Sequence, residues 1–256
     1  MIAVVSDIHS NLEALSAVLA AVRDAEDIYC TGDIVGYGPN PNECCDLVRE
    51  YKMQALQGNH DFVCANLDRL GTSDETFSDE DRALCREIYE EKNTAAQAAS
   101  RWTNSVLTPE NKGFLRSLPL QMNVRGATMV HGSPGSKKDM LDEYLMPGQI
   151  RKGLVDEIQG HILVVGHSHM PMRTQWVVNP GSVGQPRDRS WLASFATLEG
   201  AWFRFPYIRN GDMSFRLVSQ LVTIQRVPYD VTTTVKKIKQ QGELPDSLGD
   251  RLMVGL

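Results

Sequence analysis

Ile2-Ala3-Val4-Val5-Ser6-Asp7-Ile8-His9, at the start of the chain, is an apolar run that ends in an aspartate and a histidine. A similar order returns twice, because the runs at 27–30 and 53–56 precede Gly32-Asp33 and Gly58-Asn59-His60-Asp61. Residues with helical spacing separate the three runs. Strand alternating with helix is typical of a parallel sheet, so this stretch predicts an α/β fold.

Three polar residues in this stretch, Asp7, Asp33 and Asn59, are evenly spaced along the chain. The interval is close to one strand–helix unit of about 30 residues, which places the three side chains at the carboxyl ends of neighbouring parallel strands. Open α/β sheets bind their ligands at that edge. The adjacent Gly32 and Gly58 suit a sharp turn after a strand, because glycine adopts positive φ at little cost.

Further elements follow from capping and periodicity. Ser10 and Glu13 have capping-box spacing at the start of an apolar stripe, so a helix is expected from Ser10 to about Val22. Asn40-Pro41 predicts a second helix to about Tyr51, with proline in its first turn. Later strands are expected at 127–130 and 162–165, then an antiparallel set at 192–198, 201–208 and 215–221, and a last helix over 231–240.

Residues 66–118 differ in composition from the stretches on either side. Acidic residues crowd the first half, an alanine-rich stretch follows at 94–106, and Thr108-Pro109-Glu110 marks another helix start. Polar clusters of one kind lie both before and after this segment. We therefore expect a helical insertion at about 66–118 within a single domain that spans residues 1–256.

The composition excludes several classes of protein. The chain has 256 residues with 26 Lys and Arg against 32 Asp and Glu, a net charge of −6. Nucleic acid is therefore an unlikely partner, since proteins that coat it are usually basic. No apolar stretch reaches the roughly 18–20 residues of a membrane-spanning helix. The five cysteines form no Cys-x-x-Cys pair and no basic leader precedes the first apolar run, so we expect a reducing, cytoplasmic location.

Five polar clusters follow the predicted strands and contain five of the six histidines; the sixth, His161, is expected to be structural. Oxygen and nitrogen donors without thiolates suit Mn²⁺, Fe or Zn²⁺. Seven ligands are too many for one tetrahedral ion, but they suit two divalent ions that share a carboxylate, as in phosphatases and nucleases. The expected metal ligands are Asp7, His9, Asp33, Asn59, His131, His167 and His169.

The order of these clusters, D-x-H, G-D, G-N-H-D, H-G and G-H-x-H, resembles the calcineurin-like metallophosphoesterase superfamily. Residues 32–39, 131–134 and 179–188 are similar, more narrowly, to a bacterial and archaeal branch described as related to diadenosine tetraphosphatases and serine/threonine protein phosphatases. The motifs extend from residue 7 to residue 188. The resemblance implies a four-layer α/β/β/α sandwich, with two sheets between layers of helices.

The resemblance also implies how the ligands divide between two divalent ions, of which we favour Mn²⁺. One ion takes Asp7, His9, Asp33 and His169, and the other takes Asp33, Asn59, His131 and His167. A hydroxide that bridges the two ions would attack the phosphorus of a small phosphorylated substrate. No ligand of the family pattern is missing, which disfavours a relative that has lost activity.

Four residues are expected to act on the substrate or to support a residue that does. His60 is expected to protonate the leaving oxygen or stabilise the transition state, with Asp61 orienting it through a hydrogen bond. Asn59 and Arg187 are expected to contact the substrate, and the guanidinium fork of Arg187 fits phosphate well. The loop 179–188 that carries Arg187 has an equally simple interpretation as a connection between strands.

The sequence thus favours a phosphomono- or diesterase, with dinucleoside polyphosphates as one specific substrate. The alternatives are a serine/threonine protein phosphatase, for which the chain leaves little room for substrate-recruiting domains, and a binding scaffold of the same fold without turnover. The choice between mono- and diesters, the identity of the metal and the oligomeric state stay open. One two-metal centre serves both ester classes, which differ in the pocket around it.

Overall fold

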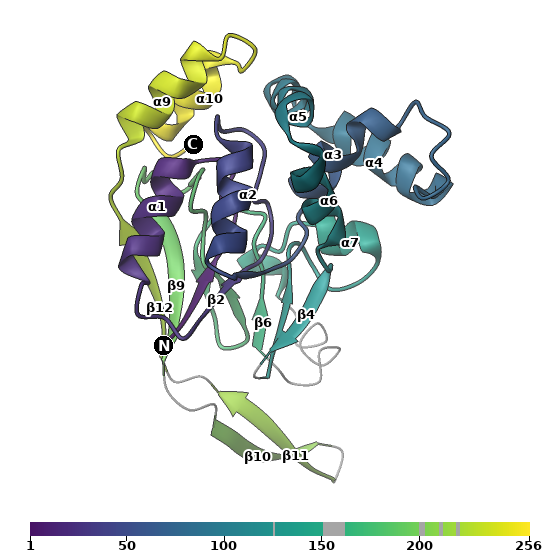
Figure 1. Cartoon of the computed structure of the whole chain (residues 1–256). Helices are drawn as coiled ribbons and strands as arrows, with labels where there is room; N and C mark the ends of the chain where they lie inside the picture. Colours follow the sequence, from purple (N-terminus) through teal and green to yellow (C-terminus); the bar gives the residue numbers. More distant parts are fainter. Residues whose placement is uncertain (125, 151–161, 200–202, 210–211, 219–220) are drawn as a thin grey trace.

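Two five-stranded mixed sheets form the centre of the computed structural model (Figure 1). It describes all residues except 125, 151–161, 200–202, 210–211 and 219–220. The first sheet has the order β12-β9-β1-β2-β3, with strands β12 (Leu221–Val227), β9 (Ala193–Glu199), β1 (Ile2–Val5), β2 (Asp27–Cys30) and β3 (Gln54–Ala55). The second has the order β4-β5-β6-β8-β7, with strands β4 (Gln121–Val124), β5 (Ala127–Val130), β6 (Ile162–Val164), β8 (Val177–Asn179) and β7 (Met172–Arg173).

Parallel pairing at the middle of each sheet sets the position of the polar clusters. β1 pairs in parallel with β2, and β2 with β3, as the N-terminal pattern predicts. In the second sheet, β5, β6 and β8 are parallel. The clusters therefore follow the carboxyl ends of parallel strands in both sheets.

Apolar side chains fill the space between the sheets and under the helices. Ile2 and Val4 of the first sheet share a buried cluster with Met129 and Val164 of the second. The other face of the first sheet packs on helices α1 (Leu12–Ala21), α2 (Pro41–Glu50), α9 (Val231–Gln240) and α10 (Asp246–Leu252). On the outer face of the second sheet, Val130 and Leu163 contact a layer that includes helix α7 (Lys137–Asp142). The predicted α/β/β/α sandwich is confirmed.

The stretch between residues 59 and 117 is helical, with α3 (Asn59–Asn66), α4 (Asp79–Glu91), α5 (Thr94–Val106) and α6 (Pro109–Ser117). Phe62, Phe77 and Ile88 belong to a small apolar cluster of its own. The predicted helix start at Thr108-Pro109 is confirmed, because the Thr108 side chain caps α6. That this stretch is an insertion in one domain over residues 1–256 stays a prediction.

The first helix begins one residue later than predicted. Asn11, not Ser10, is its N-cap residue, and the Asn11 side chain accepts a hydrogen bond from the Ala14 N–H. Ser10 instead has a φ of 54° and belongs to the turn that carries the polar cluster. Capping-box spacing favours Ser10, because Glu13 is three residues later, but Asn11 is an equally good capping residue.

The C-terminal strands do not form one antiparallel sheet, which corrects the prediction. β9 pairs antiparallel with β1 and with β12, a strand that the sequence did not reveal, so both extend the first sheet. Strands β10 (Phe203–Arg209) and β11 (Asp212–Val218) pair with each other as a separate hairpin (Figure 1). Apolar alternation predicts that a segment is a strand but does not choose its partner.

Two further expectations bear on the compartment. All five cysteines are buried and free. Among the described residues, no helix has the length and apolar character required to cross a membrane. The cytoplasmic location stays a prediction, and His161 lies outside the described residues.

Candidate metal centre

The seven predicted ligands follow five strands of the two sheets and converge in the folded chain. Asp7 and His9 follow β1, Asp33 follows β2, and Asn59 begins α3 directly after β3. From the second sheet, His131 follows β5, and His167 and His169 follow β6. All seven are at most 5% exposed.

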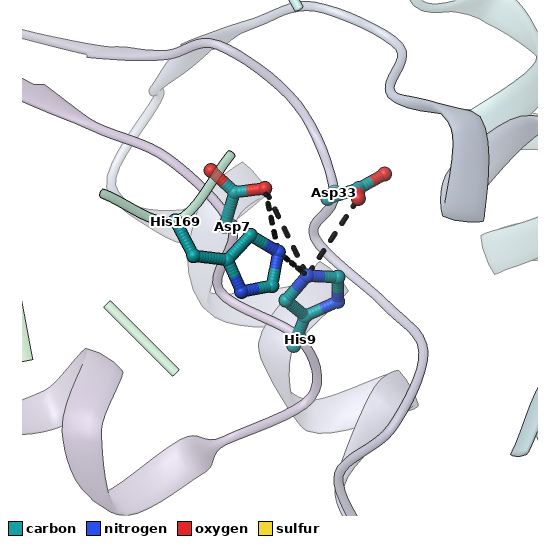
Figure 2. A group of neighbouring side chains, drawn as sticks. All are labelled: Asp7, His9, Asp33 and His169. Carbon is teal, nitrogen blue, oxygen red and sulfur yellow. Dashed lines mark hydrogen bonds and ion pairs between the residues drawn. The ribbon is translucent and has the colours of Figure 1, made fainter. Parts of the chain in front are cut away.

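Four of these side chains form the first group, Asp7, His9, Asp33 and His169 (Figure 2). The Nε2 atoms of His9 and His169 are 3.0 Å apart. Asp7 Oδ1 lies 3.3 Å from His169 Nε2, and Asp33 Oδ2 lies 3.6 Å from His9 Nε2. The carboxylate and imidazole atoms that can bind a cation therefore face one another.

Asp33, His131 and His167 form the second group. Asp33 Oδ2, which faces His9 in the first group, is also 3.3 Å from His131 Nε2. Asp33 thus lies between the two groups, as a shared carboxylate requires. Asn59 is held close to His167, because both contact Asp142: the amide through its Nδ2 and the ring through its Nε2.

Hydrogen bonds to the backbone fix which ring nitrogen of each histidine faces the site. The Nδ1 atoms of His9, His131 and His169 contact the carbonyl oxygens of Val35, Thr31 and Gln185 at 3.1, 2.9 and 2.6 Å. Nε2 is therefore left to bind a cation. His167 is reversed, since its Nε2 lies 3.1 Å from the Asp142 carbonyl and Nδ1 is left free. Such outer hydrogen bonds are how proteins orient metal-binding imidazoles.

Each carboxylate uses one oxygen for support and leaves the other free. Asp7 Oδ2 accepts bonds from the Ser6 hydroxyl and the His167 N–H, and Asp33 Oδ1 accepts from the His60 N–H. Four buried atoms of the predicted ligands have no hydrogen-bond partner: Asp7 Oδ1, Asp33 Oδ2, Asn59 Oδ1 and His131 Nε2. A buried polar atom without a partner costs about 1–3 kcal/mol. The donor set fits divalent cations, because each orphaned atom is one that a cation would bind.

The backbone at the site is strained. Asp7, His9, Asp33, His167 and His169 have φ values between 48° and 62°. Residues with a Cβ rarely adopt this left-handed region, and each such residue costs of order 1–3 kcal/mol. Gly32 has the predicted positive φ, 110°, whereas Gly58 has a φ of −95°. Most of the ligands themselves therefore adopt the positive φ that was expected of the glycines.

Asp33 and His131 shift each other's pKa through their opposite charges. Burial alone would raise the pKa of Asp33, but the charges of His131 and His60 hold it well below its usual range. Burial alone would lower the pKa of His131, but the Asp33 carboxylate raises it to about 9. Burial lowers the pKa of His9 to about 3 and that of His169 well below its usual range. These two imidazoles are therefore neutral, the form that binds metals.

His60 lies beside the two groups, but the predicted support from Asp61 is not observed. The Asp61 oxygens accept hydrogen bonds from the Val35 and Gly58 N–H groups at 3.0 and 3.1 Å. Asp61 therefore links the loop that contains Val35 to the turn that contains Gly58. The His60 ring packs against Tyr37, with 4.5 Å between centroids, and its buried Nδ1 has no hydrogen-bond partner.

A cavity of about 550 Å³ adjoins the two groups. Six of the predicted site residues line it and therefore face one space: Asp33, Asn59, His60, His167, His169 and Arg187. The sequence missed several other lining residues. Tyr37 lay inside a quoted motif without a role, whereas Asp142 belongs to no motif and no local signal marked it. The missed lining residues are Tyr37, Lys92, Asp142, Tyr144 and Arg251.

The fold and the paired His and Asp groups define a metallophosphoesterase class of protein. Residues 1–200 match the family model described as the calcineurin-like phosphoesterase superfamily domain, and the chain belongs to that superfamily.

Two relatives extend the likeness over the whole chain. An uncharacterized protein of Methanocaldococcus jannaschii is 34% identical, with 100% of this chain and 98% of the relative covered. The crystal structure of a metallophosphoesterase from Sphaerobacter thermophilus is 33% identical, covers 100% of this chain and 98% of its own, and has a TM-score of 0.73. A hypothetical protein of Pyrococcus horikoshii, 23% identical with a TM-score of 0.76 and covering 100% and 99% of the two chains, shares the fold.

Proposed function

We propose that the chain is a metal-dependent phosphoesterase that hydrolyses a small phosphorylated substrate at a dinuclear centre. The observation that supports this most directly is the convergence of four unpartnered ligand atoms beside one cavity. Asp7, His9, Asp33 and His169 would hold one ion. Asp33, Asn59, His131 and His167 would hold the other, and Mn²⁺ is the metal that we favour.

The bound ions would supply Lewis acidity, which lowers the pKa of water toward neutrality and offsets the charge of the phosphoryl group. Asp7 and Asp33 are the only carboxylates among the proposed ligands, so two divalent ions leave a net charge of about +2. This local positive charge would attract phosphate to a protein whose net charge is −6.

Two other side chains act on the substrate in this proposal. His60 lines the cavity, and its imidazole is the group that we assign to the leaving oxygen. Arg187 also lines the cavity, where its Nη2 lies 3.3 Å from the Tyr37 hydroxyl. A guanidinium held there would orient the phosphate before the bond breaks.

A panel of phosphoesters tests the proposal. Nitrophenyl mono- and diesters, a dinucleoside polyphosphate, a cyclic nucleotide and a phosphopeptide would each be assayed with Mn²⁺ and with a chelator. We expect Mn²⁺-stimulated hydrolysis of at least one small ester and none with the chelator. Hydrolysis of the phosphopeptide alone would favour a protein phosphatase, and no hydrolysis of any ester would favour a non-catalytic scaffold.

A further inference from the structure

The cavity beside the metal centre is lined by three cations that no family motif explains together. Lys92 is the C-cap residue of α4, Arg187 follows β8, and Arg251 belongs to α10. Residues 1–200 contain the family match, so Arg251 lies beyond it. Helix α10 thus brings a charged side chain to the cavity from a part of the chain that carries none of the proposed metal ligands.

The Arg251 side chain is half-buried and incompletely partnered. Its Nε and Nη2 atoms are buried without a hydrogen-bond partner. No carboxylate of the described residues forms an ion pair with Arg251 or Arg187. Burial lowers the pKa of Arg251, and the charge of Arg187 lowers it further. A buried charge without a partner is strongly destabilising, so this arrangement suits an anion bound from outside.

Glu91 and Asp142, two acidic residues that line the cavity, do not neutralise Arg187 and Arg251. Glu91 contacts Lys138, with 3.1 Å between the charged atoms. Asp142 Oδ1 accepts a hydrogen bond from the Asn59 amide at 2.5 Å. Both carboxylates therefore have other partners.

Tyr37 sets how far Arg251 lies from the metal centre. The Tyr37 ring centroid is 5.4 Å from Arg251 Cζ and 6.0 Å from Arg187 Cζ. The ring of His9, a proposed ligand, is 4.7 Å from the same centroid. The guanidinium of Arg251 is thus one aromatic ring away from the centre, within reach of a group attached to the scissile phosphate.

We infer that Arg251, together with Lys92, binds a second phosphate group of the substrate, next to the phosphate that Arg187 orients. The substrate class is then a molecule with at least two phosphate groups, one at the metal centre and one at this cationic subsite. The inference rests on the proposed function for the identity of the first position. Guanidinium groups fit phosphate oxygens through paired N–H donors, which a point charge cannot reproduce.

Calorimetric titration of the Mn²⁺-loaded protein with adenosine diphosphate and adenosine monophosphate tests the inference. The two probes differ by one phosphate, and both would be titrated at one fixed concentration of free Mn²⁺. We expect Arg251→Met to weaken diphosphate binding by about 10- to 100-fold, the usual range for hydrogen bonds to a charged group. Monophosphate binding should change less than about twofold, and Arg251→Lys should be intermediate.

Arg23→Met is the matched control, because its side chain is 80% exposed and it makes the same change of charge away from the cavity. Thermal melting would show that each variant is folded. Equal weakening of both probes by Arg251→Met, no weakening of either, or no diphosphate binding by the original protein would overturn the inference. If diphosphate binding depends on Arg251 but no phosphoester is hydrolysed, the proposed function fails and the subsite remains.

Discussion

Asp33 shows how one residue can serve two groups of ligands without ambiguity. Its Oδ1 accepts the His60 N–H at 2.8 Å, so the carboxylate cannot rotate freely, and Oδ2 is left for His9 on one side and His131 on the other. Gly58 is part of this arrangement, because a Cβ there would lie 2.2 Å from Asp33 Oδ1. The glycine before Asn59 is required by this close approach, since its own φ is −95°.

His60 carries the first prediction at this scale. Replacement by alanine should lower kcat by about 10²- to 10⁴-fold, the usual contribution of a general acid. Metal content should stay near two ions per chain, because His60 belongs to neither group of ligands. Steady-state kinetics and elemental analysis of the same preparation would measure both. Unchanged turnover would remove His60 from the mechanism, and loss of metal would make it a structural residue of the centre.

The second prediction about a single residue concerns Asp142. By accepting from Asn59 Nδ2, it turns the amide so that Oδ1 is left for the metal. Asp142→Ala should weaken the binding of one Mn²⁺ by about 10- to 100-fold, as for other residues that orient ligands. Asp142→Asn should retain most of the affinity, since its carbonyl oxygen can still accept the bond. Mn²⁺ titration would compare the two, and equal affinities for the alanine and original proteins would refute the role.

The sequence could predict the ligands but not their supports. The ligands follow strand ends in a fixed order, and order is visible in a sequence. The support from Asp142 depends on a contact between α7 and α3, which are far apart in the chain. The partner of Asp61 was predicted as His60 because the two are adjacent, yet consecutive residues on a helix point about 100° apart.

At the scale of elements, the loop at 179–188 supports the turn after β1. The Val183 and Gly184 N–H groups donate to the carbonyls of Ser6 and Asp7 at 3.0 and 2.9 Å. The Ser182 hydroxyl donates to the Asp7 carbonyl at 2.7 Å. The loop therefore has a structural role, whether or not Arg187 contacts substrate.

Gly184 is the residue at which this support can be tested. A Cβ at Gly184 would lie 1.8 Å from the Ile8 carbonyl oxygen, so Gly184→Ala must displace one of the two loops. We expect a loss of about 1–3 kcal/mol in the free energy of unfolding, as for overpacking elsewhere. Gly113→Ala in α6 is the control, since no atom lies within 4 Å of its added Cβ. It should instead stabilise by roughly 0.5–1 kcal/mol in urea unfolding; a similar loss in both variants would contradict the close-approach argument.

Helices whose starts are marked by nearby residues could be predicted from the sequence. The position of a strand that depends on pairing with a distant strand could not. Proline and capping residues mark the starts of α2 and α6 within the sequence itself. The place of β9 depends on β1, which lies near the other end of the chain. The apolar periodicity of a strand indicates which of its faces is buried. It does not indicate which distant strand pairs with it.

At the scale of the molecule, the metal centre joins the two sheets. Asp7 and His9 follow a strand of the first sheet, and His131 and His167 follow strands of the second. Bound ions would therefore stabilise the packing of one sheet on the other as well as the loops. Binding to the folded state alone stabilises by about 2.7 kcal/mol when the free metal is 100 times its Kd.

Metal removal is the prediction at this scale. A chelator should lower the melting temperature by several degrees, and excess Mn²⁺ should restore it. Asp33→Asn, which removes the shared carboxylate charge, should melt at nearly the same temperature with and without Mn²⁺. Differential scanning calorimetry would measure all four states. A chelator effect of equal size in the Asp33→Asn variant would show that the ions act elsewhere.

The pairing of β1 with β9 also affects how the chain can fold while it is being synthesised. Ile2 pairs with Leu198, so β1 leaves the ribosome long before the strand that covers one of its edges. Asp7 likewise waits for His169. Until then an apolar strand with an open edge is exposed, a state prone to aggregation that chaperones commonly protect. Closure of this long loop is the slow kind of folding step, and the metal-binding pocket is completed only at its end.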